Sequence, residues 1–254
     1  MELEQQFLDF PTQESRTVEG RNFLIYEIDC DIAKDYITKN HYAKGCHNGP
    51  SPCYGLIEGG ELIGVLMFAV PCSENVRASV FGADMKDNVL ELHRLHIKDV
   101  TPKNTESWFI SRCLKLLKID RPDIKAVLSF SDSTEGHTGI IYQATNAYFI
   151  GKTGMTTFYR DAEGRLHHPR QNGVNITKQE AMNRGWVAEK RYSKNRYLYL
   201  QAQSKTEKKE LLKKCRYDVL HYKWCRGCGK KMKINKTGNL CDACLEYIEQ
   251  GGLK

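Results

Sequence analysis

Val89-Leu-Glu-Leu-His-Arg-Leu-His-Ile97 is the stretch of sequence that decides the fold. We expect a β-strand whose side chains point alternately to its two faces, one set being Val89, Glu91, His93, Leu95 and Ile97 and the other Leu90, Leu92, Arg94 and His96. The alternation places Glu91 and Arg94 on opposite faces of that strand. Polar side chains embedded in an otherwise apolar strand also make it the first place to look for a functional site.

A helix and a second strand follow this stretch. The helix is expected to begin at Asn104, a suitable N-cap residue, and to end before Pro122, with apolar residues at helical spacing between them. The run from Lys125 to Asp132 has the apolar character of a buried strand. A second helix is expected at Gly139 to Asn146, and further strands are expected at 148–150, 156–160 and 196–200.

Upstream of the central stretch, the pattern predicts antiparallel strands. A strand at Asn22 to Asp29 is followed by a short helix at Ile32 to Lys39. Two apolar runs then flank Glu58-Gly-Gly60, which is typical of a β-hairpin. Alternating strands and helices together with an antiparallel hairpin predict an α/β fold built on a mixed sheet.

Bulk properties restrict the class of protein. The chain has 254 residues, enough for a sizeable core, and a formal net charge of +7, which favours a polyanionic partner. It contains no apolar run long enough to cross a membrane, and its acidic, polar beginning does not have the form of a secretory signal. We therefore expect a protein of a reducing cytosol, where clustered cysteines bind metal more often than they form disulfides.

The sequence divides into three segments. Residues 1–21 are expected to form a polar lead-in, residues 22–203 an α/β domain, and residues 204–254 a basic helix that leads into a cysteine-rich module.

Four cysteines near the C-terminus predict a zinc site. They form two C-x-x-C pairs, Cys225 with Cys228 and Cys241 with Cys244. Two such pairs place four thiolates around one tetrahedral ion, which leaves no open position and indicates a structural zinc ribbon. An iron or iron–sulfur site is the minor alternative.

Basic residues surround this module. A cationic loop suits contacts with nucleic-acid phosphates, and a solvated basic surface is an equally good interpretation. The residues concerned are Arg226, Lys230, Lys231, Lys233 and Lys236. The basic run that starts at Lys205 shifts the balance slightly toward nucleic acid.

Motifs that would define several enzyme classes are absent from the sequence. It contains no P-loop, G-x-G-x-x-G, G-x-S-x-G or H-E-x-x-H, which argues against nucleotide hydrolases, Rossmann dehydrogenases, α/β-hydrolases and zincins. Asp132, at the carboxyl end of a predicted strand, is well placed for a site. Each candidate also has an ordinary structural interpretation: a turn cap for Asp132, core packing for Tyr142, and sheet positions for His93 and His96.

Several motifs, in order and spacing, resemble those of the Mom family of phage DNA-modification proteins. They are Asn40-His-Tyr-Ala-Lys-Gly45, Leu90-Glu-Leu-His-Arg-Leu95, Pro102-Lys-Asn-Thr-Glu-Ser-Trp-Phe109, Leu128-Ser-Phe-Ser-Asp132 and Ile141-Tyr-Gln-Ala-Thr-Asn146. The resemblance covers roughly His41 to Gly154 and does not include the cysteine module.

The resemblance implies a fold like that of the GNAT acyltransferases and a transferase activity. Mom proteins add a carbamoylmethyl group to N6 of adenine in double-stranded DNA, in the cytoplasm of an infected bacterial host, and the modified DNA resists restriction. On this basis we expect His41, Asp132 and Tyr142 at the reaction centre. Further expected contacts are Tyr42, Arg94, Asn104 and Ser129 for substrate or donor, and Lys44 for DNA.

The donor is not evident from the sequence. The loop before the predicted helix at Asn104 lacks the glycine of ordinary GNAT enzymes, so acetyl-CoA and an aminoacyl carrier both stay open, as does a catalytic iron. Two other functions are compatible with the residues. One is a non-catalytic zinc-ribbon DNA-binding regulator, and the other is a GNAT N-acetyltransferase acting on protein or small amines. The oligomeric state is not indicated.

Overall fold

The computed structural model describes residues 14–42, 45–46, 49–171, 174–191, 193–217, 219, 222–224 and 231–233. The chain forms two compact units. Unit 1 consists of Met1–Ser129, Ile140–Ile150 and Tyr197–Lys254, and unit 2 consists of Phe130–Gly139 and Gly151–Arg196. The segment predicted as one domain, residues 22–203, is therefore divided between two units.

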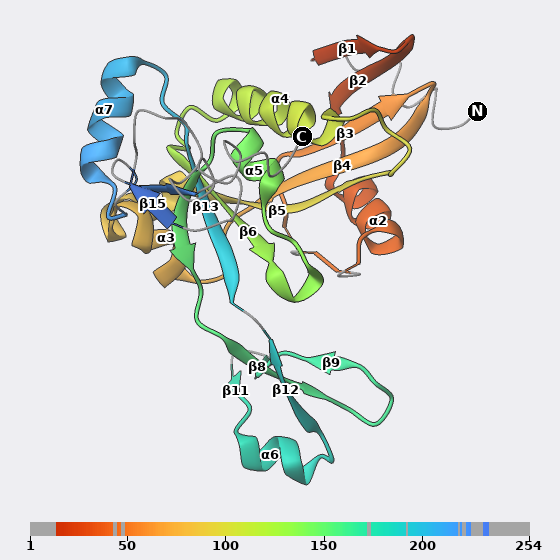
Figure 1. Cartoon of the computed structure of the whole chain (residues 1–254), viewed down its shortest axis with the longest axis vertical. Helices are drawn as coiled ribbons and strands as arrows, with labels where there is room; N and C mark the ends of the chain where they lie inside the picture. Colours follow the sequence, from red (N-terminus) through yellow and green to blue (C-terminus); the bar gives the residue numbers. More distant parts are fainter. Residues whose placement is uncertain are drawn as a thin grey trace, which may run out of the picture. The chain divides into compact units, whose positions relative to one another are not determined.

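Eight strands form the main sheet, in the order β1-β2-β3-β4-β5-β6-β13-β7 (Figure 1). They are β1 (Glu14–Val18), β2 (Arg21–Glu27), β3 (Cys53–Glu58), β4 (Glu61–Ala69), β5 (Val89–Ile97), β6 (Ala126–Asp132), β7 (Tyr148–Lys152) and β13 (Lys194–Leu200). Strands β1 to β5 pair antiparallel with their neighbours, whereas β5 and β6 pair parallel. This arrangement confirms the predicted mixed α/β sheet.

Two tight turns set the antiparallel half of the sheet. Gly59 and Gly60 both have positive φ, at 55° and 79°, which is the backbone that a two-residue hairpin turn requires. The predicted hairpin between β3 and β4 is confirmed. Glu19 and Gly20 form a second turn of this kind, with φ of 53° and 75°. That turn pairs β1 with β2, so the expectation that residues 1–21 form only a polar lead-in is wrong from Glu14 onward.

A β-bulge interrupts the predicted strict alternation of β5. In the ladder with β4, Arg94 lies opposite Met67, while Leu92 lies opposite the next residue of β4, Phe68. His93 is the extra residue on β5. A bulge of this kind reverses which face the following side chains occupy.

The reversal has visible consequences for packing. Leu90 and Leu92, before the bulge, and Ile97, after it, belong to the same apolar cluster, although strict alternation places Ile97 on the other face. The expectation that alternation separates Glu91 from Arg94 fails for the same reason. The sequence contains a sign of the bulge that the strand prediction overlooked: His93 and Arg94 are consecutive polar residues, and they shift the apolar positions from 90 and 92 to 95 and 97.

Helices cover both faces of the sheet (Figure 1). Helix α4 (Thr105–Asp120) packs on the larger apolar cluster through Phe109, Ile110, Cys113 and Leu117. Helix α2 (Cys30–Asn40) contributes Ala33, Tyr36 and Ile37 to the second cluster. The other helices are α3 (Glu74–Phe81), α5 (Ile140–Ala144), α7 (Lys205–Lys214) and the 3₁₀ segments η1 (Ala83–Asn88) and η2 (Ser133–Glu135).

Helix α7 matches the predicted basic helix. Its N-cap is Ser204, whose hydroxyl accepts a hydrogen bond from the Glu207 N–H at 3.0 Å. Leu211 is its buried residue. Among the described residues, no helix combines the length and apolar character that crossing a bilayer requires.

Unit 2 has a small sheet of its own, in the order β12-β8-β9. Its elements are β8 (Thr156–Arg160), β9 (Leu166–His167), β10 (Arg170–Gln171), β11 (Val174–Asn175), α6 (Lys178–Asn183) and β12 (Val187–Arg191). A capping box between Thr177 and Glu180 starts α6. The sequence pattern predicted only β8 here. Strands β9, β10 and β11 have two residues each and are too short to show a period, and β12 is largely polar and exposed.

Replacing Leu117 with Ala is expected to lower the free energy of unfolding by about 2–5 kcal/mol, because Leu117 is completely buried in the larger cluster. Ile119 lies on the same helix with 64% of its surface exposed, so Ile119→Ala is the matched control and is expected to change stability by no more than about 0.5 kcal/mol. Urea unfolding followed by circular dichroism measures both. Equal losses in the two variants would contradict this packing of α4.

Candidate functional site

The parallel ladder between β5 and β6 is short. It runs from Val89 opposite Ala126 to Leu92 opposite Ser129, while β5 itself continues to Ile97. Ser129, at the end of the ladder, is completely buried. Its hydroxyl has no hydrogen bond of acceptable geometry among the described residues. The Tyr142 phenol is a polar neighbour of this hydroxyl, which keeps hydrogen-bonding capacity for a bound substrate.

Tyr142 of α5 lies beside Ser129. Its side chain is buried, and its ring packs at 5.2 Å against the ring of Tyr197 from β13. Burial raises the pKa of Tyr142 to about 12, and the nearby Ser129 hydroxyl offsets part of that increase. The phenol therefore stays protonated at neutral pH, so its O–H is able to donate a hydrogen bond or a proton.

His41 and Tyr42 come from the end of α2. His41 is the C-cap residue of that helix, with its backbone N–H donating to the Ile37 carbonyl at 2.9 Å. Its buried ring stacks on Tyr42 with centroids 4.3 Å apart. Tyr42 is half exposed and lies near enough to Tyr142 to raise the pKa of that phenol. Unit 1 thus brings His41, Tyr42, Ser129 and Tyr142 into one neighbourhood.

Polar residues of β5 hold the loop that follows α2. The Arg94 Nε donates to the Gly45 carbonyl at 2.8 Å, and its Nη1 donates to the His93 carbonyl at 2.8 Å. Glu91 lies 3.6 Å from the His93 Nδ1. Arg94 therefore supports the segment next to Tyr42, which makes it a positioning residue in addition to its expected role with donor or phosphate.

Asn104 occupies the predicted position before α4 but does not cap the helix. Its backbone is left-handed, with φ of 69° and ψ of 8°, and its side chain makes no hydrogen bond to the helix. An N-cap side chain normally reaches back from an extended backbone, so this conformation directs it elsewhere. The predicted capping role is wrong. Within this turn, the Thr105 hydroxyl donates to the Pro102 carbonyl at 2.6 Å.

Asp132 belongs to unit 2 and has its own set of partners there. Its Oδ1 accepts from the Thr134 N–H at 3.0 Å, while its Oδ2 lies 3.3 Å from Arg191 and 3.5 Å from Lys194. Burial alone raises the pKa of Asp132, but the hydrogen bond from Thr134 and the charges of Lys194 and Arg191 outweigh it, so the pKa is lowered. The turn-capping interpretation of Asp132 is confirmed.

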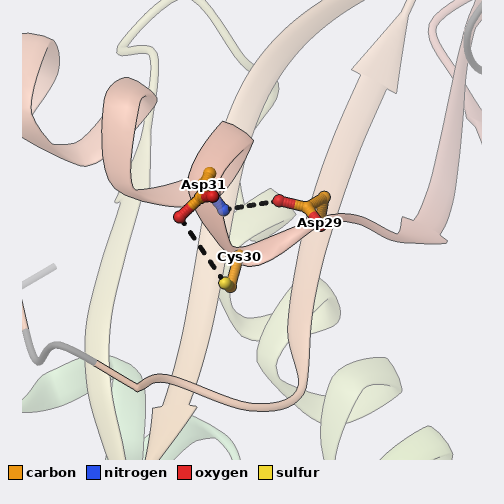
Figure 2. Close-up of side chains that lie close together, drawn as sticks. All are labelled: Asp29, Cys30 and Asp31. Carbon is orange, nitrogen blue, oxygen red and sulfur yellow. Dashed lines mark hydrogen bonds between the residues drawn. The ribbon is translucent and has the colours of Figure 1, made fainter.

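Asp29, Cys30 and Asp31 form the one group of metal-ligand side chains gathered in the described part of the chain (Figure 2). Asp29 Oδ1 accepts from the Asp31 N–H at 2.7 Å as the cap of α2, and Asp31 pairs with Lys34 at 3.0 Å. These contacts account for the group by helix capping and ion pairing. It is not a candidate site for the predicted catalytic iron.

The predicted zinc ligands fall outside the described residues. These are Cys225, Cys228, Cys241 and Cys244, and with them Lys44, Arg226, Lys230 and Lys236. Lys231 and Lys233 lie on β15 (Lys231–Lys233), which pairs antiparallel with β14 (Tyr222–Trp224).

Tyr197 is a site residue that the sequence analysis missed. It is completely buried and contacts both Tyr142 and Phe149. The strand pattern at 196–200 located its element but gave no signal of its role, since an aromatic residue in a strand is ordinarily core. The arrangement places a neutral phenol, a buried hydroxyl and an imidazole together, which suits proton transfer to and from a bound substrate.

Comparison with protein families identifies one match, which covers most of the chain. The family model described as the Mom protein family matches residues 22–223. The chain is also 30% identical over 168 residues to the methylcarbamoylase mom of Escherichia phage Mu, an alignment that spans 66% of this chain and 66% of that protein.

Comparison with solved structures finds acetyltransferases. An N-acetyltransferase from Staphylococcus aureus matches with a TM-score of 0.40 and 12% identity, over 71% of this chain and 99% of that one. The ribosomal-protein-S18-alanine N-acetyltransferase from Escherichia coli matches with a TM-score of 0.42 and 7% identity, over 72% of this chain and 96% of that one. Both likenesses concern the fold alone.

Replacing Asp132 with Asn is expected to lower stability by about 1–2 kcal/mol at pH 7, since Asn keeps an acceptor for Thr134 but loses the charge facing Arg191 and Lys194. The folded-state pKa of Asp132 is lowered, so its contribution is complete above the unfolded pKa of about 3.9 and is lost as pH falls through the folded pKa. The gap between wild type and variant should therefore close in acid. Urea unfolding at pH 7 and in acid measures it, with the exposed Asp87→Asn as control. A gap that widened in acid would contradict this assignment.

Proposed function

This chain belongs to the Mom protein family, and we propose that it is a DNA-modification transferase that adds a carbamoylmethyl group to N6 of adenine in double-stranded DNA. The observation that carries the proposal is the buried Ser129 hydroxyl at the end of the β5–β6 ladder, next to the neutral Tyr142 phenol. The family match covers every residue of this neighbourhood.

The proposed reaction breaks the N6–H bond of adenine and the bond that joins the transferred carbon to its carrier, forms an N6–C bond, and releases the carrier, with the N6 proton passing to a general base. His41 is the better general base in our proposal, because Asp132 is held ionised by hydrogen bonds and cations that weaken it as a base. Tyr142 donates a hydrogen bond or proton to the group being transferred or displaced, and Ser129 completes its hydrogen bonding on the substrate. Asp132 instead orders the turn that follows β6.

The target atom lies inside the base stack of a duplex. The adenine therefore leaves the stack, at an unstacking cost of about a few kcal/mol, and we propose that Tyr42 stacks on the flipped base. Tyr42 suits this contact, since it is 51% exposed beside the buried His41. A bulky substituent on N6 changes the donor that adenine presents in the major groove, which is how the product would escape restriction enzymes.

The donor and the metal are separate questions. The dipole of α4 favours a donor phosphate at the turn that contains Asn104. An acetyl group has no nitrogen, so acetyl-CoA alone does not supply a carbamoylmethyl group, and an aminoacyl carrier is the donor in our proposal. Four cysteine thiolates in two C-x-x-C pairs are the donor set of a structural zinc ion, which would supply folding energy to residues 225–244. The basic residues around that module are proposed to hold DNA phosphates.

Cells that express the wild-type chain are expected to contain a heavier deoxyadenosine, detected by mass spectrometry of nucleosides. Tyr142→Phe is expected to reduce its yield by about a hundredfold or more, since it removes the donated proton. Tyr54→Phe is the matched control, because Tyr54 is another buried tyrosine of unit 1 with a raised pKa. Full modification by Tyr142→Phe would remove Tyr142 from the mechanism, and unmodified adenine with the wild type would contradict the proposed activity.

Purified protein is expected to hold one zinc ion per chain by inductively coupled plasma mass spectrometry, as four thiolates predict. Cys228→Ser should lose the metal and expose residues 225–244 to proteolysis, because the ion supplies their folding energy. Cys72→Ser is the control, since Cys72 is an exposed free thiol outside the module. Retention of zinc by both Cys228→Ser and Cys241→Ser would rule out the proposed ligands.

A further inference from the structure

A second concave site lies in unit 1, and neither Ser129 nor Tyr142 is among its lining residues, although Thr145 of its lining donates to the Tyr142 carbonyl at 3.1 Å. It is a cavity of about 300 Å³ formed where the second half of α4 meets the end of α5, the ends of β7 and β13, and α7. The Gln201 N–H that follows β13 donates to the Lys125 carbonyl just before β6, so the cavity lies where β6 begins. The end of the β5–β6 ladder at Ser129 lies further along β6.

The lining of this cavity carries only positive formal charge. Lys115 and Lys118 come from α4 and Lys208 comes from α7, and no carboxylate is among the lining residues. Lys115 pairs with Glu14 of β1 at 2.5 Å. Among the described residues, no carboxylate lies within ion-pair distance of Lys118 or Lys208. Lys208 instead lies over the ring of Tyr148, at 5.7 Å from its centroid.

The neighbouring acidic groups are already engaged. Glu207 of α7 pairs with Lys125 at 2.7 Å, and Glu14 is held by Lys115. The Lys118 carbonyl, in the last turn of α4, accepts a hydrogen bond from the Gln203 side chain at 2.7 Å. One of the carbonyls left without an intrahelical partner at the C-terminus of α4 is therefore satisfied. Lys118 and Lys208 thus line a cavity whose other walls combine Asn146 and Gln201 with leucine and tyrosine side chains.

The positive surface also continues beyond the cavity. Lys205 and Lys209 lie on α7 on either side of Lys208 in sequence, and both are exposed. A small phosphorylated molecule needs only the cavity, whereas a row of cations that extends outward suits a chain of phosphates.

We propose that this cavity anchors a backbone phosphate of the DNA, through Lys118 and Lys208, outside the pocket that receives the modified base. The inference rests on the proposed function, because it takes DNA as the substrate. Lys118 and Lys208 hold DNA without touching the reacting atoms, so they determine affinity rather than the rate of the chemical step.

The test uses the full-length protein and a fluorescein-labelled DNA duplex, with binding followed by anisotropy over a range of KCl concentrations. Each phosphate contact contributes about 0.9 to the slope of log K against log salt. Lys118→Gln and Lys208→Gln are each expected to reduce that slope by about 1 and to weaken binding about eightfold at 0.1 M KCl. Lys39→Gln removes the same charge from α2 and should leave both quantities unchanged.

Two further readouts separate the outcomes. At saturating duplex, both pocket variants should modify DNA at the wild-type rate. If both variants keep the wild-type affinity and slope, the anchor is wrong, even if the wild type modifies adenine. If both variants lose affinity but the wild type modifies no adenine, the proposed activity is wrong and the anchor stands. Calorimetry with AMP provides the other arm: AMP binding that both variants abolish, with duplex affinity intact, would reassign the cavity to a free nucleotide and overturn the DNA contact.

Discussion

The parallel ladder between β5 and β6 constrains everything else in the candidate site. It ends at Leu92 and Ser129, and the polar part of β5 lies beyond that point. The bulge at His93 then keeps Ile97 in the same apolar cluster as Leu90 and Leu92. Without the bulge, the strand would bury its apolar residues on opposite faces before and after its midpoint. A strand that is core at its beginning and part of a site at its end requires this irregularity.

Environment, rather than residue type, sets the chemistry of the candidate groups. Tyr142 is buried among other aromatic rings and keeps its proton, while Asp132 gains a backbone hydrogen bond and two cations and loses its proton. Groups whose pKa values are moved apart in this way are suited to different roles. Our assignment of Tyr142 as donor and of Asp132 as an ordering residue follows from that contrast.

Binding and chemistry are distributed over different parts of unit 1. The neighbourhood of Ser129 is formed by α2, β6 and α5, whereas the cationic cavity is formed by α4, α7, the strand ends beside them and the end of α5, which adjoins both. In a transferase that acts on a long polyanion, such separation has a physical advantage. Phosphate contacts supply affinity that depends on salt but not on sequence, and the reacting base is then handled in a drier place.

The sequence by itself determined the elements that local pattern encodes. The Gly59-Gly60 hairpin, the amphipathic α4 and the buried run of β6 are all visible as periods and turn residues, and they suffice for an α/β fold with a mixed sheet. Only the tertiary structure decided the left-handed Asn104, the burial of Ser129 beside Tyr142 and the cavity that Lys118 and Lys208 both line. These features depend on pairing and packing between segments far apart in the chain, and no periodicity within one segment records which partner it will meet.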